Sequence, residues 1–379
     1  MTELPGLIDK VFPLPARFRQ TLPRDISELS RLLTSGRTDR SGSYLGKPAL
    51  LSAYLRYFLP WNIYRLCRLF SFLPLDLKPH DAVTDLGAGP LTLALSLWIS
   101  RPDLRAVPLE FRCLDKTAAV LDAGKKLFAA LCEETKSRDC RWTIRTIRGD
   151  IRHNSALSKG KPAALTAAVN VYNELFWDFS PSDTRELERF TGRQARQLSF
   201  LTENSGSILV VEPGIPRSGE FISLLRSGLI KEGRIPLLPC THSGPCPLPG
   251  GRAGFGKATG KAKWCHFAFD TEDAPRALHK LSAAARLPKE RATLSFIYTG
   301  MSGRPDNTAS NEPVRIISDS FPVGNTGEWG RYGCSGRGLV LVTGSRKSLE
   351  HSPSGALEEL ALSDGLRDAK SGALLAAIT

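Results

Sequence analysis

The chain has few cysteines for its length and no long apolar run, and these two scarcities exclude whole classes of protein. Eight cysteines among 379 residues are too few for a small disulfide-held scaffold, so we expect a reducing, cytoplasmic location. The N-terminus has no apolar segment like that of a signal peptide. The most apolar early stretch, residues 51–73, contains three arginines and a proline. It predicts a pair of amphipathic helices and no membrane span; an interfacial helix is the alternative.

Acidic side chains are also outnumbered. The sequence has 51 Lys and Arg against 38 Asp and Glu, which gives a net charge of +13. This excess favours a polyanionic partner, because Lys and Arg neutralise phosphates and release counterions. A generally basic surface explains the charge equally well. The hydrophobic share of 41% is that of an ordinary globular protein, and the length suggests two or three units.

From residue 81 onward, the sequence alternates between buried strands and amphipathic helices. Helices are expected after the first, second, fourth and fifth strands. The helix after the fourth strand is expected to cover residues 183–201. This alternation predicts an open, largely parallel α/β sheet. The five expected strands cover residues 82–87, 111–115, 141–150, 165–172 and 207–214.

Changes in composition and in strand or helix pattern along the sequence predict four regions. Residues 234–264 are rich in Pro, Gly and Lys and predict an irregular segment, after which strand character returns at 293–300, 314–323 and 338–344. The regions are an N-terminal helical region (1–78), a cofactor-binding domain (79–230), a cysteine-rich region with closing strands (231–348) and a loose or weakly helical tail (349–379).

A glycine loop follows the first expected strand. The loop runs from Asp85 through Gly87 and Gly89, but Thr92 replaces the last glycine of a dinucleotide fingerprint. A carboxylate there would repel a pyrophosphate, whereas it suits a ligand with an ammonium and a sulfonium. The loop resembles motif I of class I S-adenosylmethionine-dependent methyltransferases. This resemblance implies that Asp85, Gly87 and Gly89 bind S-adenosylmethionine.

Acids end the next two strands as well. Asp115 is expected to accept hydrogen bonds from the ribose diol, and Asp150 to reach the adenine edge. A single acid in such a position is more often a helix cap or a solvated turn, but three acids after three successive strands favour a cofactor site. Leu91 replaces a third glycine common in methyltransferases, and we expect it to narrow the methionine end of the pocket.

The fourth strand is followed by the groups expected to face the methyl acceptor. Amino-directed methyltransferases often carry Asn/Asp-Pro-Pro-aromatic here, and this chain has no Pro-Pro. Asn173 and Glu174 are the candidate catalytic residues, with Asn170 and Tyr172 beside them.

Four of the eight cysteines are grouped with Gly, Pro, His and Trp. Thiolates at short loop spacing suit a soft metal or an iron–sulfur centre, and four of them also suit tetrahedral zinc, in which a histidine could replace a sulfur. Unconnected thiols in a flexible loop are the remaining alternative. The candidate ligands are Cys240, Cys246, Cys265 and Cys334, with His242 and His266 nearby.

Five short motifs in the second half of the sequence occur in one order: EPGIPRSG after the fifth strand, then CTHSGPCPL, WCHF, SFIYTG and a late Gly-Cys pair. Together they resemble one family, and the resemblance runs from about residue 53 to residue 344. The family is the Rsm-type, or methyltransferase-like protein seventeen, family of the small ribosomal subunit. The resemblance implies a class I methyltransferase Rossmann-like α/β fold with an N-terminal helical region, a cysteine-rich metal-binding insertion and a small β region. It also implies that the four cysteines hold a 4Fe-4S cluster; zinc is the alternative.

The cysteine-rich region also carries a basic, glycine-rich loop. Arg252, Lys257, Lys261 and Lys263 could contact phosphates without reading bases, although a solvated linker is also compatible. The sequence therefore predicts an S-adenosylmethionine-dependent methyltransferase acting on or with small-subunit ribosomal RNA. The alternative is a non-catalytic, metal-containing assembly factor that uses the methyltransferase fold as a scaffold.

Overall fold

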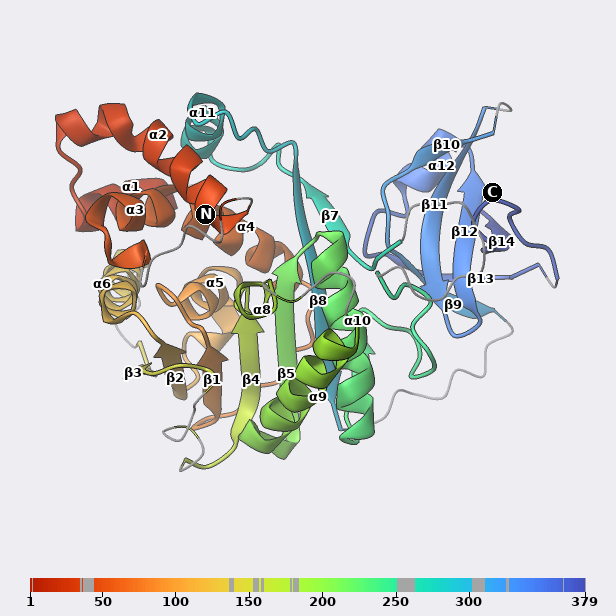
Figure 1. The fold of residues 1–379 in the computed structure, drawn as a ribbon, viewed down its shortest axis with the longest axis horizontal. Coiled ribbons are helices and arrows are strands. Elements are labelled where there is room, and N and C mark those ends of the chain that lie inside the picture. The colour runs from red at the N-terminus through yellow and green to blue at the C-terminus, as the bar shows by residue number, and fades with distance from the viewer. Residues whose placement is uncertain are drawn as a thin grey trace. The chain divides into compact units, whose positions relative to one another are not determined.

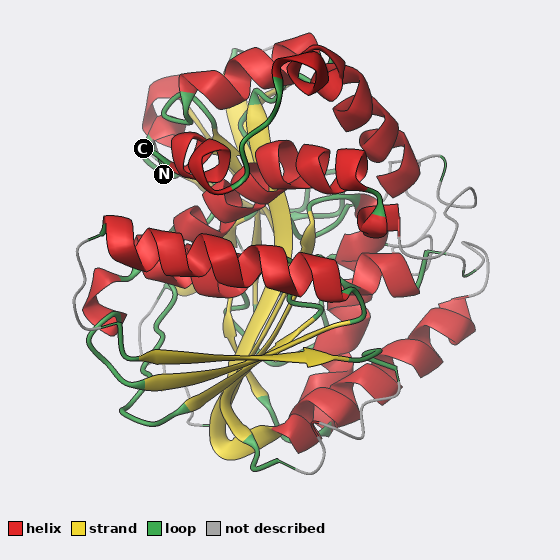
Figure 2. Ribbon diagram, turned by 90° about the vertical axis from the view of Figure 1, so that its left-hand side faces the viewer, coloured by secondary structure: helices red, strands yellow, loops and turns green. Residues whose placement is uncertain are grey.

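The computed structural model describes most of the chain as two compact units. The described residues are 1, 3–34, 36, 44–135, 140–152, 157, 160–177, 179, 184–250, 263–301, 311–324, 327–363 and 365–378. Unit 1 comprises residues 1–169 and 269–292, and unit 2 comprises residues 170–268 and 293–379. Both units contain helices and strands, and Figure 2 shows the two kinds of element together, so the predicted α/β class is confirmed.

Unit 1 begins with helices and continues as alternating strands and helices (Figure 1). Its helices are α1 Leu4–Val11, α2 Ala16–Leu33, η2 Tyr44–Gly46, α3 Pro48–Ala53, the π-helical turn η3 Tyr54–Phe58, α4 Leu59–Phe70, α5 Thr92–Ser100, η4 Pro102–Leu104, α6 Ala118–Glu134 and α11 Arg276–Ala284. Its strands are β1 Ala82–Leu86, β2 Leu109–Asp115, β3 Trp142–Arg148 and β4 Ala163–Val169.

The four strands of unit 1 are parallel, in the order β3-β2-β1-β4. β1 is buried along its whole length because helices cover both faces of a parallel sheet. The chain proceeds from β1 to one side through β2 and β3, and then returns to the other side of β1 at β4. Ligands bind at the carboxyl ends of strands where the strand order reverses in this way. The fold therefore places a binding position directly after β1.

The apolar stretch at residues 51–73 is one helical run through α3, η3 and α4. Its buried side chains form a core with α2 and α11, to which Tyr57, Trp61 and Leu278 contribute. Trp61 donates to Ser282, and Tyr57 donates to the carbonyl of Leu287, so α11 is fixed to this run. The expected amphipathic helices thus bury their apolar face inside unit 1. Among the described residues, no helix is long and apolar enough to cross a membrane.

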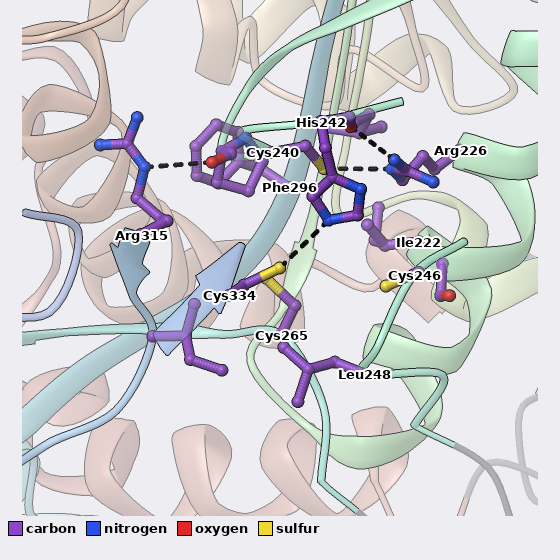
Figure 3. Close-up of a pocket in the computed structure, with 14 residues that line it drawn as sticks. Ile222, Arg226, Cys240, His242, Cys246, Leu248, Cys265, Phe296, Arg315 and Cys334 are labelled. Atoms are coloured by element: carbon purple, nitrogen blue, oxygen red, sulfur yellow. Dashed lines mark hydrogen bonds between the residues drawn. The ribbon is translucent and has the colours of Figure 1, made fainter. Parts of the chain in front are cut away.

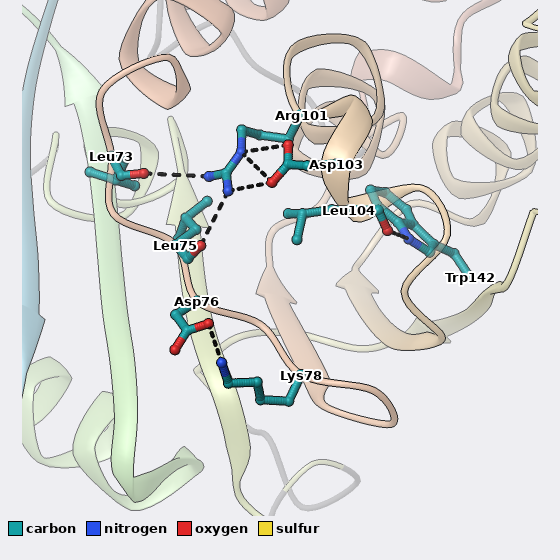
Figure 4. A network of polar contacts seen from close by, with 8 residues as sticks. All are labelled: Leu73, Leu75, Asp76, Lys78, Arg101, Asp103, Leu104 and Trp142. Atoms are coloured by element: carbon teal, nitrogen blue, oxygen red, sulfur yellow. Dashed lines mark hydrogen bonds and ion pairs between the residues drawn. The ribbon is translucent and has the colours of Figure 1, made fainter.

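Arg101 fixes the segment that leads from α4 to β1. Its guanidinium donates to the carbonyl oxygens of Leu73 and Leu75 and forms an ion pair with Asp103 (Figure 4). Only 19% of the Arg101 side chain is exposed, so these bonds are partly shielded from water. They set the point at which the chain enters the sheet.

Unit 2 contains three neighbouring strands, in the order β5-β8-β6, and a separate sheet of six strands, β9 to β14. Its helices are α8 Tyr172–Leu175, α9 Thr184–Leu201, α10 Pro216–Lys231 and α12 Arg346–Glu350. Its strands are β5 Thr202–Pro213, β6 Ile235–Leu238, β8 Arg291–Gly300, β9 Glu312–Ile316, β10 Phe321–Val323, β11 Glu328–Ser335, β12 Gly338–Gly344, β13 Leu357–Leu360 and β14 Leu374–Ala377, with β7 Phe267–Asp270 at the unit boundary.

Unit 2 departs from the sequence prediction in two places. The strand β8 is antiparallel to both β5 and β6, and β6 lies in the segment expected to be irregular. The tail expected to be loose contributes β13 and β14, which form opposite ends of the sheet β13-β9-β11-β12-β14. Their pairing with β9 and β12 and a shared apolar core stabilise these short strands, which carry little periodicity of their own.

Candidate cofactor site and cysteine cluster

Asp85 is a buried carboxylate without a partner. It lies near the end of β1 with 1% of its surface exposed, and among the described residues neither carboxylate oxygen has a hydrogen-bond partner. Burial, together with the smaller effect of the negative charge of Asp115, raises the pKa of Asp85 to about 8. A buried charge without a partner is costly. A cationic ligand group would supply the missing partner.

Asp115 holds the glycine loop in place. Its carboxylate accepts hydrogen bonds from the backbone N–H groups of Gly89 (3.0 Å) and Thr117 (2.8 Å). Gly87 and Gly89 have φ values of 71° and 54°, a left-handed conformation that glycine adopts without strain. Each carboxylate oxygen has a second lone pair, so Asp115 can still accept from a ligand hydroxyl.

Gly124 of α6 allows the helix to pack directly on this loop. A Cβ at Gly124 would stand 2.5 Å from the carbonyl carbon of Pro90 and 2.6 Å from Cγ of Leu91. Leu91 is fully buried and has a φ of 59°, which costs a non-glycine residue ~1–2 kcal/mol. Its side chain packs against α6, and its burial offsets that cost. The expected narrowing of the methionine end by Leu91 stays a prediction.

Asp150 lies after β3, where it was expected, but its carboxylate is engaged. Arg152 forms an ion pair with it at 2.7 Å and also donates its backbone N–H at 2.8 Å. The Asp150 side chain is 31% exposed. A direct contact of this carboxylate with adenine would require Arg152 to move, and the proposed role of Asp150 stays a prediction.

The candidate catalytic residues lie in unit 2 at the start of α8. Glu212, fully buried in β5, accepts hydrogen bonds from the backbone N–H groups of Tyr172 (2.8 Å) and Asn173 (3.2 Å). Burial raises the pKa of Glu212 to about 8, although these backbone bonds oppose the shift. Asn173 is buried and Glu174 is half-buried. Glu212 therefore fixes the backbone that carries both candidates.

Tyr172 was expected to face the methyl acceptor, and this expectation is wrong. Its side chain is 0% exposed. The ring packs against Phe221 and Phe190, with ring centroids 5.1 and 6.3 Å away. The next residue after β4, Asn170, has a φ of 54°, which Asn tolerates better than most side chains. The turn thus directs Tyr172 into the aromatic core of unit 2.

The four predicted cysteine ligands line one cavity in unit 2 (Figure 3). Cys240 follows β6, and Cys265 precedes β7. Cys334 lies within β11, which pairs with β9 and β12. The apolar side chains of Ile222, Leu248 and Phe296 line the same cavity. The remaining cysteine of the cluster is Cys246. The fold thus brings together thiols that are far apart in the sequence.

Polar groups also contact the cysteines. The guanidinium of Arg226, on α10, donates to Sγ of Cys240 (3.2 Å) and to the carbonyl of His242 (2.6 Å). Nε2 of His242 lies 3.5 Å from Sγ of Cys334. Arg315 of β9 donates to the carbonyl of Pro239. The cavity therefore combines soft sulfur donors with two guanidinium groups that would offset negative charge.

Burial dominates the titration of the two deepest thiols. It raises the pKa of Cys265 and Cys334 well above 9, and the charges of the neighbouring thiols raise it further. Among the described residues, no group of three or more His, Cys, Asp or Glu side chains is arranged to hold a metal ion. The four cysteines therefore line one cavity, but their described side chains are not arranged around a metal ion.

The base of the predicted basic loop is closed by backbone contacts. Pro249 and Trp264 form a β-bridge, and the N–H of Gly250 donates to the carbonyl of Lys263. The Lys263 ammonium lies 3.8 Å from the ring centre of Tyr332, a cation–π contact. The other three cations of the loop, Arg252, Lys257 and Lys261, lie outside the described residues.

Residues 185–321 match the family model described as mitochondrial small ribosomal subunit Rsm22. This match agrees with the resemblance predicted from the sequence, over part of the chain. The Rsm22 match includes Glu212 and Arg226 and three of the four clustered cysteines; Cys334 lies beyond it. The glycine loop also lies outside the match. No curated protein matches the chain in sequence.

Solved structures of methyltransferases resemble the chain weakly. Fibrillarin from Aeropyrum pernix with bound S-adenosyl-L-methionine is 19% identical, with a TM-score of 0.29 over 46% of this chain and 68% of that one. A methyltransferase from Pyrococcus furiosus is 11% identical, with a TM-score of 0.30 over 47% and 73%. The plantazolicin methyltransferase BpumL, in complex with a monoazolic desmethylPZN analog and SAH, is 13% identical, with a TM-score of 0.37 over 76% of this chain and 100% of that one.

Sequence reasoning missed three residues that support these sites. Gly124 could have been noticed because a glycine within a helix costs ~1 kcal/mol relative to alanine and usually marks close packing. Glu212 is an acid within an apolar strand, and Arg226 lies on the buried side of α10 with 2% exposure. Charges that interrupt an apolar pattern are therefore the signal that would have identified them.

Proposed function

We propose that the protein is an S-adenosylmethionine-dependent methyltransferase-like protein that acts on or with small-subunit ribosomal RNA. The observation that carries the cofactor assignment is the carboxylate of Asp85, which is buried beside a glycine loop and has no hydrogen-bond partner in the described part of the chain. A perturbed acid at the carboxyl end of a central strand is typical of a ligand site. The Rsm22 match supports the association with the small ribosomal subunit.

The residues of unit 1 fit the cofactor that the family implies. Asp85 would pair with the ammonium group, Asp115 would accept from the ribose diol, and Gly87 and Gly89 would let the backbone approach the ligand. The bound cofactor supplies an electrophilic methyl group on its sulfonium. Catalysis by this chain then consists mainly of orienting the methyl acceptor. We assign that role to Asn173 and Glu174, which Glu212 positions.

The donor chemistry of the unit 2 cavity suits a 4Fe-4S cluster, although the described side chains are not arranged around a metal ion. Four thiols line one cavity with an apolar wall, and Cys240, Cys246, Cys265 and Cys334 would be the ligands. Arg226 and Arg315 would offset the negative charge of a thiolate-bound cluster. Zinc remains the alternative because His242 lies beside Cys334. In either case, we infer a structural role, in which the metal holds the base of the basic loop.

The second candidate function is a non-catalytic assembly factor built on the same fold. The absence of Pro-Pro after β4 and the presence of Leu91 in the glycine loop favour it. The description of the matched family names mitochondria, so a mitochondrial location is proposed beside the predicted cytoplasmic one. Both candidate functions require ribosomal RNA as a partner, and they differ in methyl transfer.

Calorimetric titration with S-adenosylmethionine tests the cofactor assignment. We expect one site per chain, and a matched variant, Asp85→Ala, should abolish the heat of binding. The absence of binding at millimolar ligand would overturn the enzyme assignment and leave the scaffold. Methyl transfer from radiolabelled cofactor to small-subunit RNA then separates a binding protein from an enzyme.

Anaerobic purification followed by metal analysis tests the cluster. Four iron atoms per chain with brown absorbance would support a 4Fe-4S centre, and one zinc without colour would identify the alternative. A preparation that folds with neither metal would refute both assignments of the cysteines.

A further inference from the structure

An open groove lies in unit 1, between α2 and the end of α11. It encloses about 630 Å³, which is room for a stretch of polymer backbone instead of a single ion. Its lining is positively charged and contains no acidic side chain: Pro23, Arg24, Ser27, Ser30, Arg31, Thr34, Ala284, Ala285, Arg286 and Leu287.

The walls of the groove are held together by a hydrogen bond. The hydroxyl of Ser27 on α2 donates to the carbonyl of Ala285 at the end of α11 (2.8 Å). Packing of Ile26 and Leu29 in the same core as Leu278 and Ala285 supports this contact. The groove is therefore a fixed feature of unit 1.

Two of the three arginines are available to a ligand. Arg31 forms an ion pair with Glu28 at 2.9 Å. Among the described residues, Arg24 and Arg286 have no ion-pair partner, and both are exposed. Arg24 and Arg31 are seven residues apart, which places them two turns apart on the same side of α2.

The backbone at Arg286 provides an independent observation. Arg286 follows the end of α11 with a φ of 55°, the left-handed position that glycine or asparagine usually occupies after a helix. An arginine there is strained because its Cβ crowds the neighbouring backbone. Strained residues of this kind cluster at binding sites. The strained position of Arg286 brings its positive charge to the groove.

We propose that the groove formed by Arg24, Ser30, Arg31 and Arg286 binds the phosphate backbone of RNA. Arginine and serine are among the side chains that contact phosphate oxygens in nucleic-acid complexes. The apolar part of the described lining consists of Pro23, Ala284, Ala285 and Leu287 and has no aromatic ring, and the chain's net charge of +13 favours a polyanion. The groove rests on the proposed function for its partner, and it adds an RNA contact distant in sequence from the cysteine-rich region.

The test uses the full chain, a fluorescein-labelled 20-nucleotide RNA of mixed sequence, and fluorescence anisotropy between 50 and 200 mM KCl. The variant is Arg24→Ala with Arg286→Ala. The control removes two exposed lysines of α6 in the same unit, Lys125→Ala with Lys126→Ala, and so changes the net charge equally. Circular dichroism and S-adenosylmethionine titration check the fold of each protein.

Each lost phosphate contact lowers the slope of log K against log[salt] by ~0.7 on single strands. Two lost contacts should therefore weaken binding about 25-fold at 0.1 M salt, while the control changes little. Equal losses in the variant and the control would overturn the groove and leave the proposed function intact. If the unmodified protein binds no RNA, both the groove and the RNA part of the proposed function fail. Binding to phosphatidylserine vesicles without RNA binding would also overturn the proposal.

Discussion

Replacement of Asp85 by asparagine should stabilise the ligand-free protein and weaken its cofactor binding. The carboxylate is 1% exposed and, within the described part of the chain, accepts no hydrogen bond. Asparagine has nearly the same shape and no charge. The variant therefore removes the cost of burying a charge while it keeps the packing.

The magnitude follows from the pKa of Asp85, which rises from 3.8 to about 8 on folding. The folded protein keeps the proton that the unfolded chain releases, so the folded state binds more protons between pH 4 and pH 8. The free energy of unfolding of the unmodified protein then falls as pH rises, by up to ~1.4 kcal/mol per unit. At pH 7, the accumulated cost is ~4 kcal/mol, and Asp85→Asn does not incur it.

The assay is chemical denaturation of both proteins at pH 5, 6, 7 and 8. The stability advantage of Asp85→Asn should grow with pH across this range. Asp76→Asn is the control, because Asp76 is an exposed acid paired with Lys78; its effect should be small and nearly constant. An advantage of Asp85→Asn that does not change with pH would refute the argument, because it would mean that Asp85 titrates normally.

Cofactor binding should change in the opposite direction. The ammonium of S-adenosylmethionine pairs with an ionised carboxylate, so the affinity of the unmodified protein should rise between pH 6 and pH 7.5, by up to tenfold per unit. Loss of this charge-assisted bond costs ~1.5–3 kcal/mol, which corresponds to a 10- to 100-fold weaker affinity in Asp85→Asn. Calorimetry measures both effects, and unchanged affinity in the variant would show that Asp85 does not contact the cofactor.

Three further substitutions test the supports of the two sites. Gly124→Ala should displace the glycine loop, lower the free energy of unfolding by ~1–3 kcal/mol and weaken S-adenosylmethionine binding. Gly6→Ala is the control, because a Cβ at Gly6 meets open space, and it should change neither stability nor binding. The same melting temperature and cofactor affinity in both variants would contradict the packing argument. Glu212→Gln removes the cost of the raised pKa of Glu212, ~3 kcal/mol at pH 7, but leaves one backbone N–H without its acceptor, which costs ~1–3 kcal/mol. Its gain in the free energy of unfolding at pH 7 should therefore be smaller than the pKa shift alone predicts, and a gain of the full amount in chemical denaturation would contradict its positioning role. Cys246→Ser should lose metal and stability together, and Cys67→Ser should retain the metal; the same metal content in both would exclude Cys246 as a ligand.

The parallel part of the fold could be predicted because its signals are local. Buried strands such as β1 and β4 read as continuous apolar runs, and each is bounded by turn residues. The strands β6 and β13 could not be predicted, because four residues beside Pro or Gly have no measurable period. Their conformation is set by pairing with β8 and β9, residues far away in the sequence.

The candidate sites were predictable to different degrees. The glycine loop is contiguous, so Asp85, Gly87 and Gly89 could be proposed as cofactor contacts from the motif that they form. Cys334 was a weak candidate by spacing, and only the pairing of β11 with its neighbours brings it to Cys265. The direction of Tyr172 depends on one left-handed residue before it, a feature that side-chain pattern does not encode.

Two buried acids with similar pKa values distinguish a structural role from a ligand role. Burial raises the pKa of both Asp85 and Glu212 to about 8. Glu212 accepts two backbone N–H bonds and so has a structural explanation within its own unit. Asp85 has no such explanation among the described residues. The shift in pKa alone would have pointed to a binding site for both residues; the difference in hydrogen bonding supports the proposed ligand role for Asp85 alone.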